Sequence, residues 1–475
     1  MIETITAVNQ AVNQFIWGVP AMVCIIGVGL LLSVRTGFLQ IRKFPYAIKI
    51  TIGRMFRKKD ASDGAMTPFQ AVCTALAGTV GTGNIAGVAG AIAIGGPGAV
   101  FWMWCSALLG MCTKFSEVTL AVHYRERSEA GEWVGGPMYY IKNGLSKHWQ
   151  FLAVLYSLFG VLTVFGTGNA TQVNTIVAAI DTALTEFNVV GQNALSTLNL
   201  VVGIVVAMLV AMVLLGGIKR IGSVSEKLVP FMALFYIVLS VGVMVLNFER
   251  LPYVFESIIA GAFNPAAFTG GTIGSLFISM QKGVSRGIFS NEAGLGSAAI
   301  ASAAAQNRNP VRQALISSSG PFWDTVIICA LTGIVLTTSI IAQPDISCTD
   351  GPRLTTLAFS KIPYIGSPLL TLSLVTFVVS TILGWSYFGE KALEYLGGIR
   401  LIMPYRVIWV AAVFIGCVSK IELVWIFADC ANGLMALPNL ISLLALSGVL
   451  VQQTRYYLWQ HRLDDYDESH IPEGK

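Results

Sequence analysis

The stretch GTVGTGNIAG, at residues 78–87, lies within a long apolar segment and decides the fold. Its three glycines and two threonines between residues 78 and 84 are poor helix formers, because each glycine costs about 1 kcal/mol relative to alanine in a helix interior. An unpaired amide in the bilayer centre costs several kcal/mol, so such a stretch persists where it lines a polar cavity. The stretch predicts a transmembrane helix that is broken near mid-membrane. The alternative is a tight packing seam, since small residues let helices approach each other.

The composition of the whole chain supports a membrane protein. Of 475 residues, 55% are apolar, and 30 Lys and Arg with 25 Asp and Glu make up only 12%. Soluble globular proteins carry about 25% charged residues. Mean hydropathy is +0.70. This composition excludes a soluble enzyme, a disordered chain and a collagen-like fibre. The net charge of +5 does not indicate nucleic-acid binding, because the basic residues lie in loops between apolar segments.

Hydropathy predicts an all-α polytopic membrane protein with eleven transmembrane helices. No segment alternates as a barrel strand would. The predicted spans are roughly 12–34, 66–94, 98–122, 150–180, 197–217, 228–247, 269–303, 312–340, 366–396, 404–420 and 424–452. The corresponding regions are an N-terminal helix with a basic loop (1–65), a first five-helix repeat (66–247), an extracellular connection (248–269), a second five-helix repeat (270–452) and a cytoplasmic tail (453–475).

The distribution of basic residues predicts the orientation. The loop at 35–65 contains eight Lys and Arg, and the loops on the same side carry most of the others. Cytoplasmic loops are enriched in Lys and Arg, so this side is predicted to face the cytoplasm. The N-terminus is then outside and the C-terminus inside. The first apolar segment lacks a basic start and a cleavage site, and is expected to remain as a helix.

An internal repeat supports a transporter architecture. The sequence GTGNIAG at 81–87 and the sequence FSNEAG at 289–294 both contain Asn-x-Ala-Gly, and a Phe-Trp pair follows each in the next span. Each copy begins a block of five spans, and an odd number of spans inverts the second block. Inverted repeats with leading helices broken at mid-membrane are typical of secondary transporters. The second break is predicted within residues 283–291, with the small residues continuing to 297.

Several polar side chains within the spans are candidates for a site. Gln172 is expected to face a central cavity, with interhelical hydrogen bonding as the alternative. Phe289 could line a small pocket, which ordinary packing explains equally well, and Trp385 could cap the site. Ser380 and Thr381 could add two oxygens to carbonyls of a broken helix and bind Na⁺, or could bond back to their own helix.

Charged residues within spans suggest further roles. Arg286 or Lys282 is predicted to pair with Asp429 as an outer gate. Lys114 and Glu117 are expected to form a structural pair, and Asp324 lies midway along the eighth span.

Five motifs together resemble the alanine/glycine:cation symporter family, also called sodium:alanine symporters or amino acid carrier proteins. They are GGPGAVFWMW (95–104), GTGNIAG (81–87), GGPMY (135–139), SNEAGLGS (290–297) and LGWSY (383–387). The resemblance implies one extra N-terminal helix before a five-plus-five inverted-repeat, LeuT-like core. It also implies bacterial or archaeal uptake of alanine or glycine with Na⁺ at the cytoplasmic membrane.

The resemblance also implies site residues. Substrate would contact the following residues: Thr79, Gly81, Thr82, Gly83, Asn84, Gln172, Phe289, Ser290, Asn291 and Trp385. Na⁺ would bind Val80, Gly83, Ser380 and Thr381. No organic cofactor and no obligatory protein partner are expected, and the partners are the amino acid, Na⁺ and the lipid bilayer.

Three functions compete at this point. The first is an Na⁺-coupled symporter, in which a net-neutral zwitterion suits breaks that contain few charges. The second is an H⁺-coupled or facilitative transporter or channel. The third is an intramembrane hydrolase, which the absence of any His within a predicted span disfavours. No Gly-Lys-Ser/Thr motif suggests ATP-driven pumping.

Overall fold

The computed structural model describes residues 11–12, 15, 17–55, 66–186, 188–263, 276–307, 309–342, 351–359, 362, 366–418 and 422–463. Helices of the N-terminal half are α2 (Val19–Arg35), α3 (Leu39–Arg42), α4 (Phe44–Met55), α5 (Pro68–Thr79), η1 (Gly83–Gly87), α6 (Val88–Gly95), α7 (Gly98–His123), α8 (Pro137–Gly144), η2 (Lys147–Trp149), α9 (Phe151–Phe165), η3 (Gly166–Ala170), α10 (Thr171–Glu186), η4 (Gln192–Ala194), α11 (Leu195–Leu214) and α12 (Gly217–Leu246).

The C-terminal half continues the helical pattern. Its helices are η5 (Phe248–Arg250), α13 (Leu251–Phe263), α14 (Leu276–Asn291), α15 (Ser297–Ala303), α16 (Pro310–Ser317), η7 (Phe322–Cys329), α17 (Ala330–Ala342), α18 (Gly351–Phe359), α19 (Gly366–Gly397), η9 (Ile399–Leu401), α20 (Ile402–Val418), α21 (Glu422–Ala445), α22 (Ser447–Gln453) and η10 (Thr454–Trp459). Within the described ranges, the strands are β1 (Glu126–Arg127) and β2 (Trp133–Val134), an antiparallel pair that places Glu126 opposite Val134.

Seven helical segments of the described residues are long and apolar enough to cross a membrane, and two bent pairs of helices also qualify. The seven coincide with the spans predicted at 98–122, 150–180, 197–217, 228–247, 312–340, 366–396 and 404–420. One bent pair corresponds to the predicted span 66–94. The other bends by 60° between α21 and α22, inside the segment predicted as one straight span at 424–452. The total of eleven spans stays a prediction, because α2 is short and α14 with α15 does not meet the same criteria.

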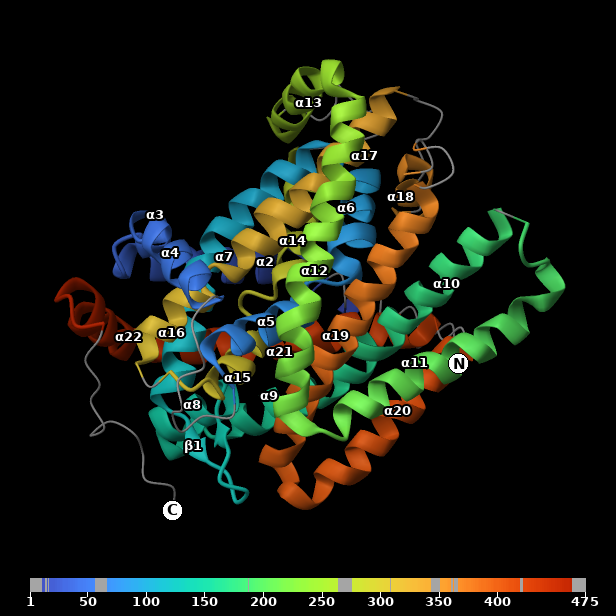
Figure 1. Cartoon of the computed structure of the whole chain (residues 1–475). Coiled ribbons are helices and arrows are strands. Elements are labelled where there is room, and N and C mark those ends of the chain that lie inside the picture. The colour runs from blue at the N-terminus through green and yellow to red at the C-terminus, as the bar shows by residue number, and fades with distance from the viewer. Residues whose placement is uncertain are drawn as a thin grey trace.

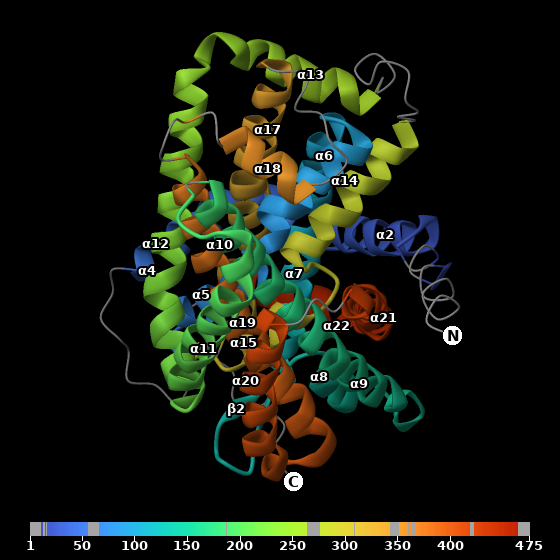
Figure 2. The ribbon, with the colours of Figure 1, turned by 90° about the vertical axis from the view of Figure 1, so that its right-hand side faces the viewer.

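Burial separates central from peripheral helices. In α7, 83% of the most apolar stretch of 18 residues is buried, compared with 28% of the corresponding stretch in the segments that contain α11 and α20. The long helix α12 runs along the outside, and α13 lies across its end (Figures 1 and 2). Exposed apolar side chains on these outer helices, such as Phe231 and Val407, are the surface expected to contact lipid.

Local sequence explains why the helices around the first break begin where they do. Thr67 accepts a hydrogen bond from the Gln70 amide, and the Gln70 side chain accepts one from the Thr67 amide. This capping box, with Pro68 in the first turn, fixes the start of α5. The helix is therefore defined at its start, and its end is decided by the glycine-rich stretch.

Candidate functional site

The first break lies where the sequence predicts it. Helix α5 ends at Thr79, Val80 has an extended conformation (φ −80°, ψ 95°), and the chain re-enters a helix at η1. The two halves differ in direction by 52°. The Gly81 amide donates to Oδ1 of Asn84 at 2.8 Å, so Asn84 satisfies one of the backbone groups that the break releases.

Glycine is required in this break because other helices approach its backbone closely. A Cβ atom on Gly81 would lie 2.4 Å from the Thr381 hydroxyl oxygen and 3.3 Å from Oε1 of Gln172. A Cβ atom on Gly83 would lie 3.3 Å from the Phe289 ring. The structure thus brings Gln172, Phe289 and Thr381 together around the break.

Two hydroxyl groups on α19 face the last carbonyls of α5. Thr381 donates to the Val80 carbonyl at 3.2 Å, and Ser380 lies 3.5 Å from the Ala77 carbonyl. Each hydroxyl is also within hydrogen-bond distance of the Phe377 carbonyl of its own helix. Bonding back to the helix, one of the two alternatives considered from the sequence, therefore occurs, and Na⁺ binding by these hydroxyls stays a prediction. Two pairs of neutral oxygens therefore lie between α19 and the end of α5, on four buried residues.

Gly83, predicted as a fourth cation ligand, is placed differently. Its carbonyl accepts a hydrogen bond from the Val88 amide within the helix that follows the break. The Ala77 carbonyl, which the sequence analysis did not select, faces Ser380 instead. The Ala77 carbonyl therefore faces the α19 hydroxyls, whereas the Gly83 carbonyl is bonded within its own helix. The contact of Ala77 is made by its backbone carbonyl, which every residue has, so the sequence could not single this residue out.

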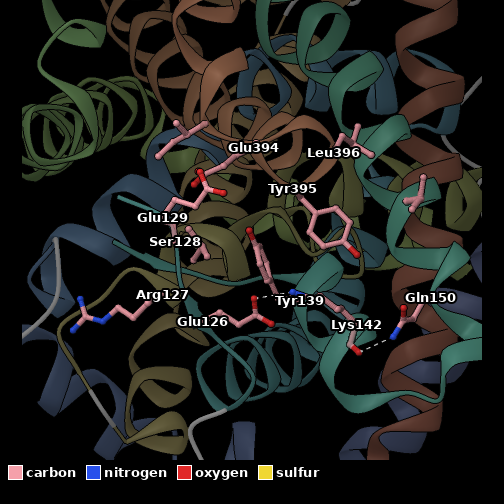
Figure 3. A pocket seen from close by; sticks show the side chains of 14 residues that line it. Glu126, Arg127, Ser128, Glu129, Tyr139, Lys142, Gln150, Glu394, Tyr395 and Leu396 are labelled. Carbon is pink, nitrogen blue, oxygen red and sulfur yellow. Dashed lines mark hydrogen bonds and ion pairs between the residues drawn. The ribbon is translucent and has the colours of Figure 1, made fainter. Parts of the chain in front are cut away.

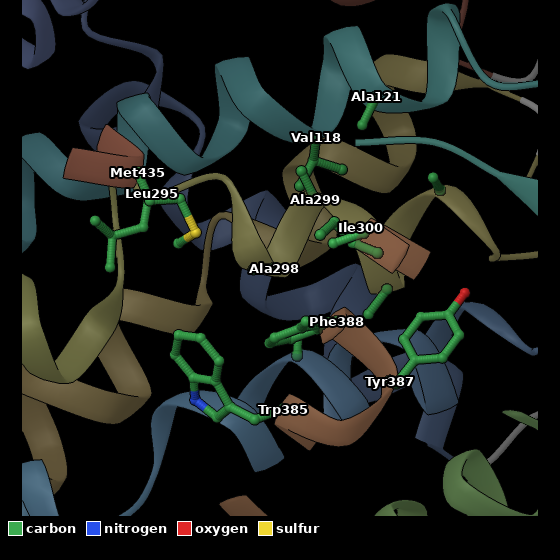
Figure 4. Packing of buried hydrophobic residues seen from close by; sticks show 14 of the residues in the cluster. Val118, Ala121, Leu295, Ala298, Ala299, Ile300, Trp385, Tyr387, Phe388 and Met435 are labelled. Atoms are coloured by element: carbon green, nitrogen blue, oxygen red, sulfur yellow. The ribbon is translucent and has the colours of Figure 1, made fainter. Parts of the chain in front are cut away.

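Gln172 and Trp385 also contact the first break. The Thr82 amide lies 3.4 Å from Oε1 of Gln172, and Gln172 donates to the Thr167 carbonyl. Trp385 donates from Nε1 to the Gly78 carbonyl at 3.1 Å. Its ring meets the Phe388 ring edge to face, with ring centroids 5.7 Å apart, in the same buried cluster as Leu295 and Ala298 (Figure 4). Both residues therefore contact the backbone of the first break.

Asp324 links the first break to the end of α14. Its carboxylate accepts from Nδ2 of Asn84 at 2.7 Å and from the Ser290 hydroxyl at 2.8 Å, and also from the Thr325 hydroxyl. Asp324 is fully buried. Asp324 was placed midway along the eighth span from the sequence, but it is not among the predicted site residues. A lone carboxylate in an apolar segment was the signal that could have identified it.

The second break does not lie at 283–291, so that prediction was wrong. Residues 276–291 form the continuous helix α14, and the chain leaves helical geometry at 292–296, where φ is positive at Glu292 (56°), Gly294 (96°) and Gly296 (77°). A Cβ atom on Gly283 would lie 2.3 Å from the Ala99 carbonyl oxygen, and one on Gly287 would lie 2.3 Å from the Ser106 hydroxyl. These two glycines therefore allow α14 to pack closely against α7.

The remaining predicted residues on α14 are distributed around this break. Asn291, its last residue, donates to the Thr325 hydroxyl at 3.1 Å and accepts from the Ala293 amide. The Arg286 guanidinium lies 5.5 Å from the centre of the Phe289 ring. The Asp429 side chain lies outside the described residues, so the predicted gate between Arg286 and Asp429 stays a prediction.

A cavity of about 510 Å³ lies away from both breaks, between the β1–β2 hairpin, α8 and the end of α19. Tyr139 and Tyr395 meet there edge to face, and Lys142 pairs with Glu126 at 2.9 Å (Figure 3). Burial, with Glu394 and Glu126 nearby, raises the pKa of Tyr139. The cavity shares no lining residue with the predicted site, although Tyr139 belongs to the GGPMY motif at 135–139.

Comparison with known proteins identifies the class of molecule. The chain is 45% identical over 473 residues to an uncharacterized transporter of Haemophilus influenzae, covering 98% of this chain and 99% of that protein. It is 44% identical to the sodium/alanine symporter AgcS of Methanococcus maripaludis, covering 96% and 98%. The solved structure of MhsT in complex with L-phenylalanine shares the fold, with a TM-score of 0.55, 12% identity, and coverage of 84% and 99%.

The two relatives are named as a transporter and a symporter, and this chain is a multi-pass membrane transporter and not an enzyme. The family model for the sodium:alanine symporter family matches residues 2–471. That match includes both breaks, the hydroxyl pair on α19 and Asp324. The chain belongs to the sodium:alanine symporter family.

Proposed function

We propose that this protein imports a small neutral amino acid, alanine or glycine, together with Na⁺ by alternating access. The observation that carries the proposal is the set of neutral oxygens from Ala77, Val80, Ser380 and Thr381. Carbonyls freed by a broken helix are the groups that coordinate Na⁺ in transporters of this architecture. In this proposal, Na⁺ replaces the two hydroxyl-to-carbonyl hydrogen bonds and holds the break against α19.

The amino acid binds beside the ion at the first break. The Thr82 amide and Gln172 provide polar contacts, while Phe289 and Trp385 limit the volume available to the side chain. The name of the Methanococcus relative, a sodium/alanine symporter, supports a small substrate. The close approach of Phe289 to Gly83 supports alanine or glycine over a larger residue.

The overall mechanism follows the predicted repeats. Residues 66–247 and 270–452 form the inverted halves, with the N-terminus outside and the C-terminus in the cytoplasm. The bundle containing α5–α7, α14–α17 rocks against the remaining helices. One Na⁺ charge crossing 100 mV supplies about 2.3 kcal/mol for accumulation.

Uptake of radiolabelled alanine into proteoliposomes tests the proposal. We expect accumulation above the external concentration with an inward Na⁺ gradient, and none with an equal K⁺ gradient or a pH gradient. Accumulation under the pH gradient alone would indicate H⁺ coupling. Equilibration without accumulation under every gradient would indicate a facilitative transporter. Either of these results contradicts Na⁺ coupling, and unlabelled glycine as a competitor tests the substrate class.

A further inference from the structure

Two charged residues of α7 contact the second break from within the core. Lys114 and Glu117 lie one turn apart, with exposed fractions of 3% and 0%. The Lys114 ammonium donates to the Asn291 carbonyl at 2.7 Å. Oε1 of Glu117 accepts from the amides of Gly294 and Gly296 at 2.9 and 3.1 Å. Lys114 therefore bonds to the backbone just before the break, and Glu117 bonds to the backbone within it.

We propose that Lys114 and Glu117 are positioning residues that hold the second break in its transport-competent shape. The inference rests on the proposed transport function, and it assigns this pair a role distinct from ligand binding. A pair that only neutralised itself would direct its charges at each other. Here the cation meets the carbonyl end of the 16-residue helix α14, where the helix dipole favours positive charge. The anion meets two N–H groups released by the break.

The cost of burial supports a specific role. Removing a charge from water is costly, and pairing and hydrogen bonds offset that cost. Charge-assisted bonds to backbone groups are about twice as strong as neutral ones, and here they flank Glu292, whose φ of 56° is strained for a residue other than glycine. The Lys114 ammonium meets a carbonyl and the Glu117 carboxylate meets two amides, so each charge matches its backbone partner. This match explains why charged side chains, and not smaller polar ones, occupy these positions of α7.

The same contacts connect the break to helices outside the proposed moving bundle. Asn439 of α21 donates to Oε1 of Glu117 at 2.7 Å and to the Gly294 carbonyl at 2.8 Å. Tyr156 of α9 donates to the Leu295 carbonyl at 2.9 Å. The break is thus bonded to α7 on one side and to α9 and α21 on the other. Oε1 of Glu117, on α7, accepts hydrogen bonds both from the break and from Asn439 of α21. Replacing Glu117 would therefore remove the atom that joins α7, the break and α21.

Charge reversal distinguishes positioning from a simple ion pair. We compare Lys114→Met, Glu117→Gln and the exchanged double variant Lys114→Glu/Glu117→Lys in the proteoliposome assay. Uptake is expressed per mole of monodisperse protein, so that poor folding does not count as lost turnover. Ser116→Ala is the matched control, because the Ser116 hydroxyl bonds to the Cys112 carbonyl of its own helix.

Each single variant is expected to lower the maximal rate by about tenfold while the KM for alanine changes less than threefold, because the ligands at the first break are untouched. The exchanged variant is expected to stay as slow as the singles, since its ammonium would face N–H groups and its carboxylate a carbonyl. Recovery of half the wild-type rate in the exchanged variant would overturn the proposal in favour of an ordinary ion pair.

The isosteric Glu117→Gln variant decides the case if the exchanged variant does not fold. A turnover within twofold of wild type for its monodisperse fraction would also overturn the proposal. The wild-type protein is measured first in every series. If wild-type protein fails to take up alanine, the proposed function is wrong, whereas active wild type with unaffected variants contradicts only the positioning role.

Discussion

The two breaks share a sequence pattern but differ in what surrounds them. Both contain Asn-x-Ala-Gly, and their asparagines bond to adjacent residues of η7, Asn84 to Asp324 and Asn291 to Thr325. The first break is a short bend whose carbonyls face the neutral hydroxyls of α19. The second is a five-residue link with three positive φ values, bonded to buried Lys114 and Glu117.

This difference suggests a division of labour. Neutral hydroxyls form weak bonds of about 0.5–1.5 kcal/mol, which a cation can replace. Charged side chains satisfy backbone groups more strongly, so the same groups are not available to a ligand. The first break is therefore suited to binding, and the second to mechanical connection. On these proposals, the helix that faces a break, and not the repeated motif, decides which role the break takes.

The largest expected effect comes from filling the first break. Gly81→Ala places a Cβ atom 2.4 Å from the Thr381 hydroxyl. Overpacking of this kind costs about 1–3 kcal/mol, and here it also displaces a proposed ion ligand. We expect Na⁺-driven alanine uptake to fall by about a hundredfold. Gly87→Ala is the control, because its Cβ atom meets nothing within 4 Å. Equal activity of the two variants would show that the first break is not the binding region.

Asp324→Asn tests the side chain that joins the first break to α14. The carboxylate accepts from both Asn84 and Ser290, and hydrogen bonds to charged groups contribute about 1.5–3 kcal/mol each. In asparagine, an NH₂ group replaces one carboxylate oxygen. That NH₂ group would face a side chain that donates a hydrogen bond to Asp324, so this hydrogen bond would be lost. We expect the uptake efficiency kcat/KM to fall by about thirtyfold. The control is Glu390→Gln, a buried carboxylate that pairs with Arg406. Wild-type efficiency in Asp324→Asn would mean that the link is not needed for transport.

The sequence predicted the first break well because its determinants are local. Three glycines within six residues, in a segment too apolar for a surface loop, leave few other structures, and the 52° bend lies there. The second break was misplaced because Gly283 and Gly287 also look like helix breakers, although the contact with α7 explains them. Sequence alone does not show which helix faces a glycine. The contacts of Ala77, and those of Lys114 and Glu117 beyond their predicted structural pair, depend on the same long-range packing and could not be predicted for that reason.

Thr381→Val tests the ion at the first break while leaving the shape nearly unchanged. The substitution removes one hydroxyl, worth about 0.5–1.5 kcal/mol as a hydrogen-bonding group. We expect the Na⁺ concentration for half-maximal uptake to rise about tenfold, with an unchanged alanine KM at saturating Na⁺. Thr376→Val on the same helix is the control, because its hydroxyl bonds to the Leu372 carbonyl. A shift in alanine KM without a shift in Na⁺ dependence would assign Thr381 to the substrate instead.

The smallest effect on transport is expected at Gly283, which the sequence analysis placed in a break. An added Cβ atom would lie 2.3 Å from the Ala99 carbonyl oxygen, so Gly283→Ala should separate α14 from α7 and destabilise the protein by about 1–3 kcal/mol. Because the first break is not altered, alanine KM and Na⁺ dependence should stay within threefold of wild type, while the melting temperature of the purified protein falls. Gly90→Ala, with open space around its Cβ position, should leave both unchanged. A large increase in KM with an unchanged melting temperature would instead place Gly283 in the binding region. That result would contradict the distinction between the first break, which is proposed to bind the ligands, and the contact between α14 and α7, which only packs the two helices together.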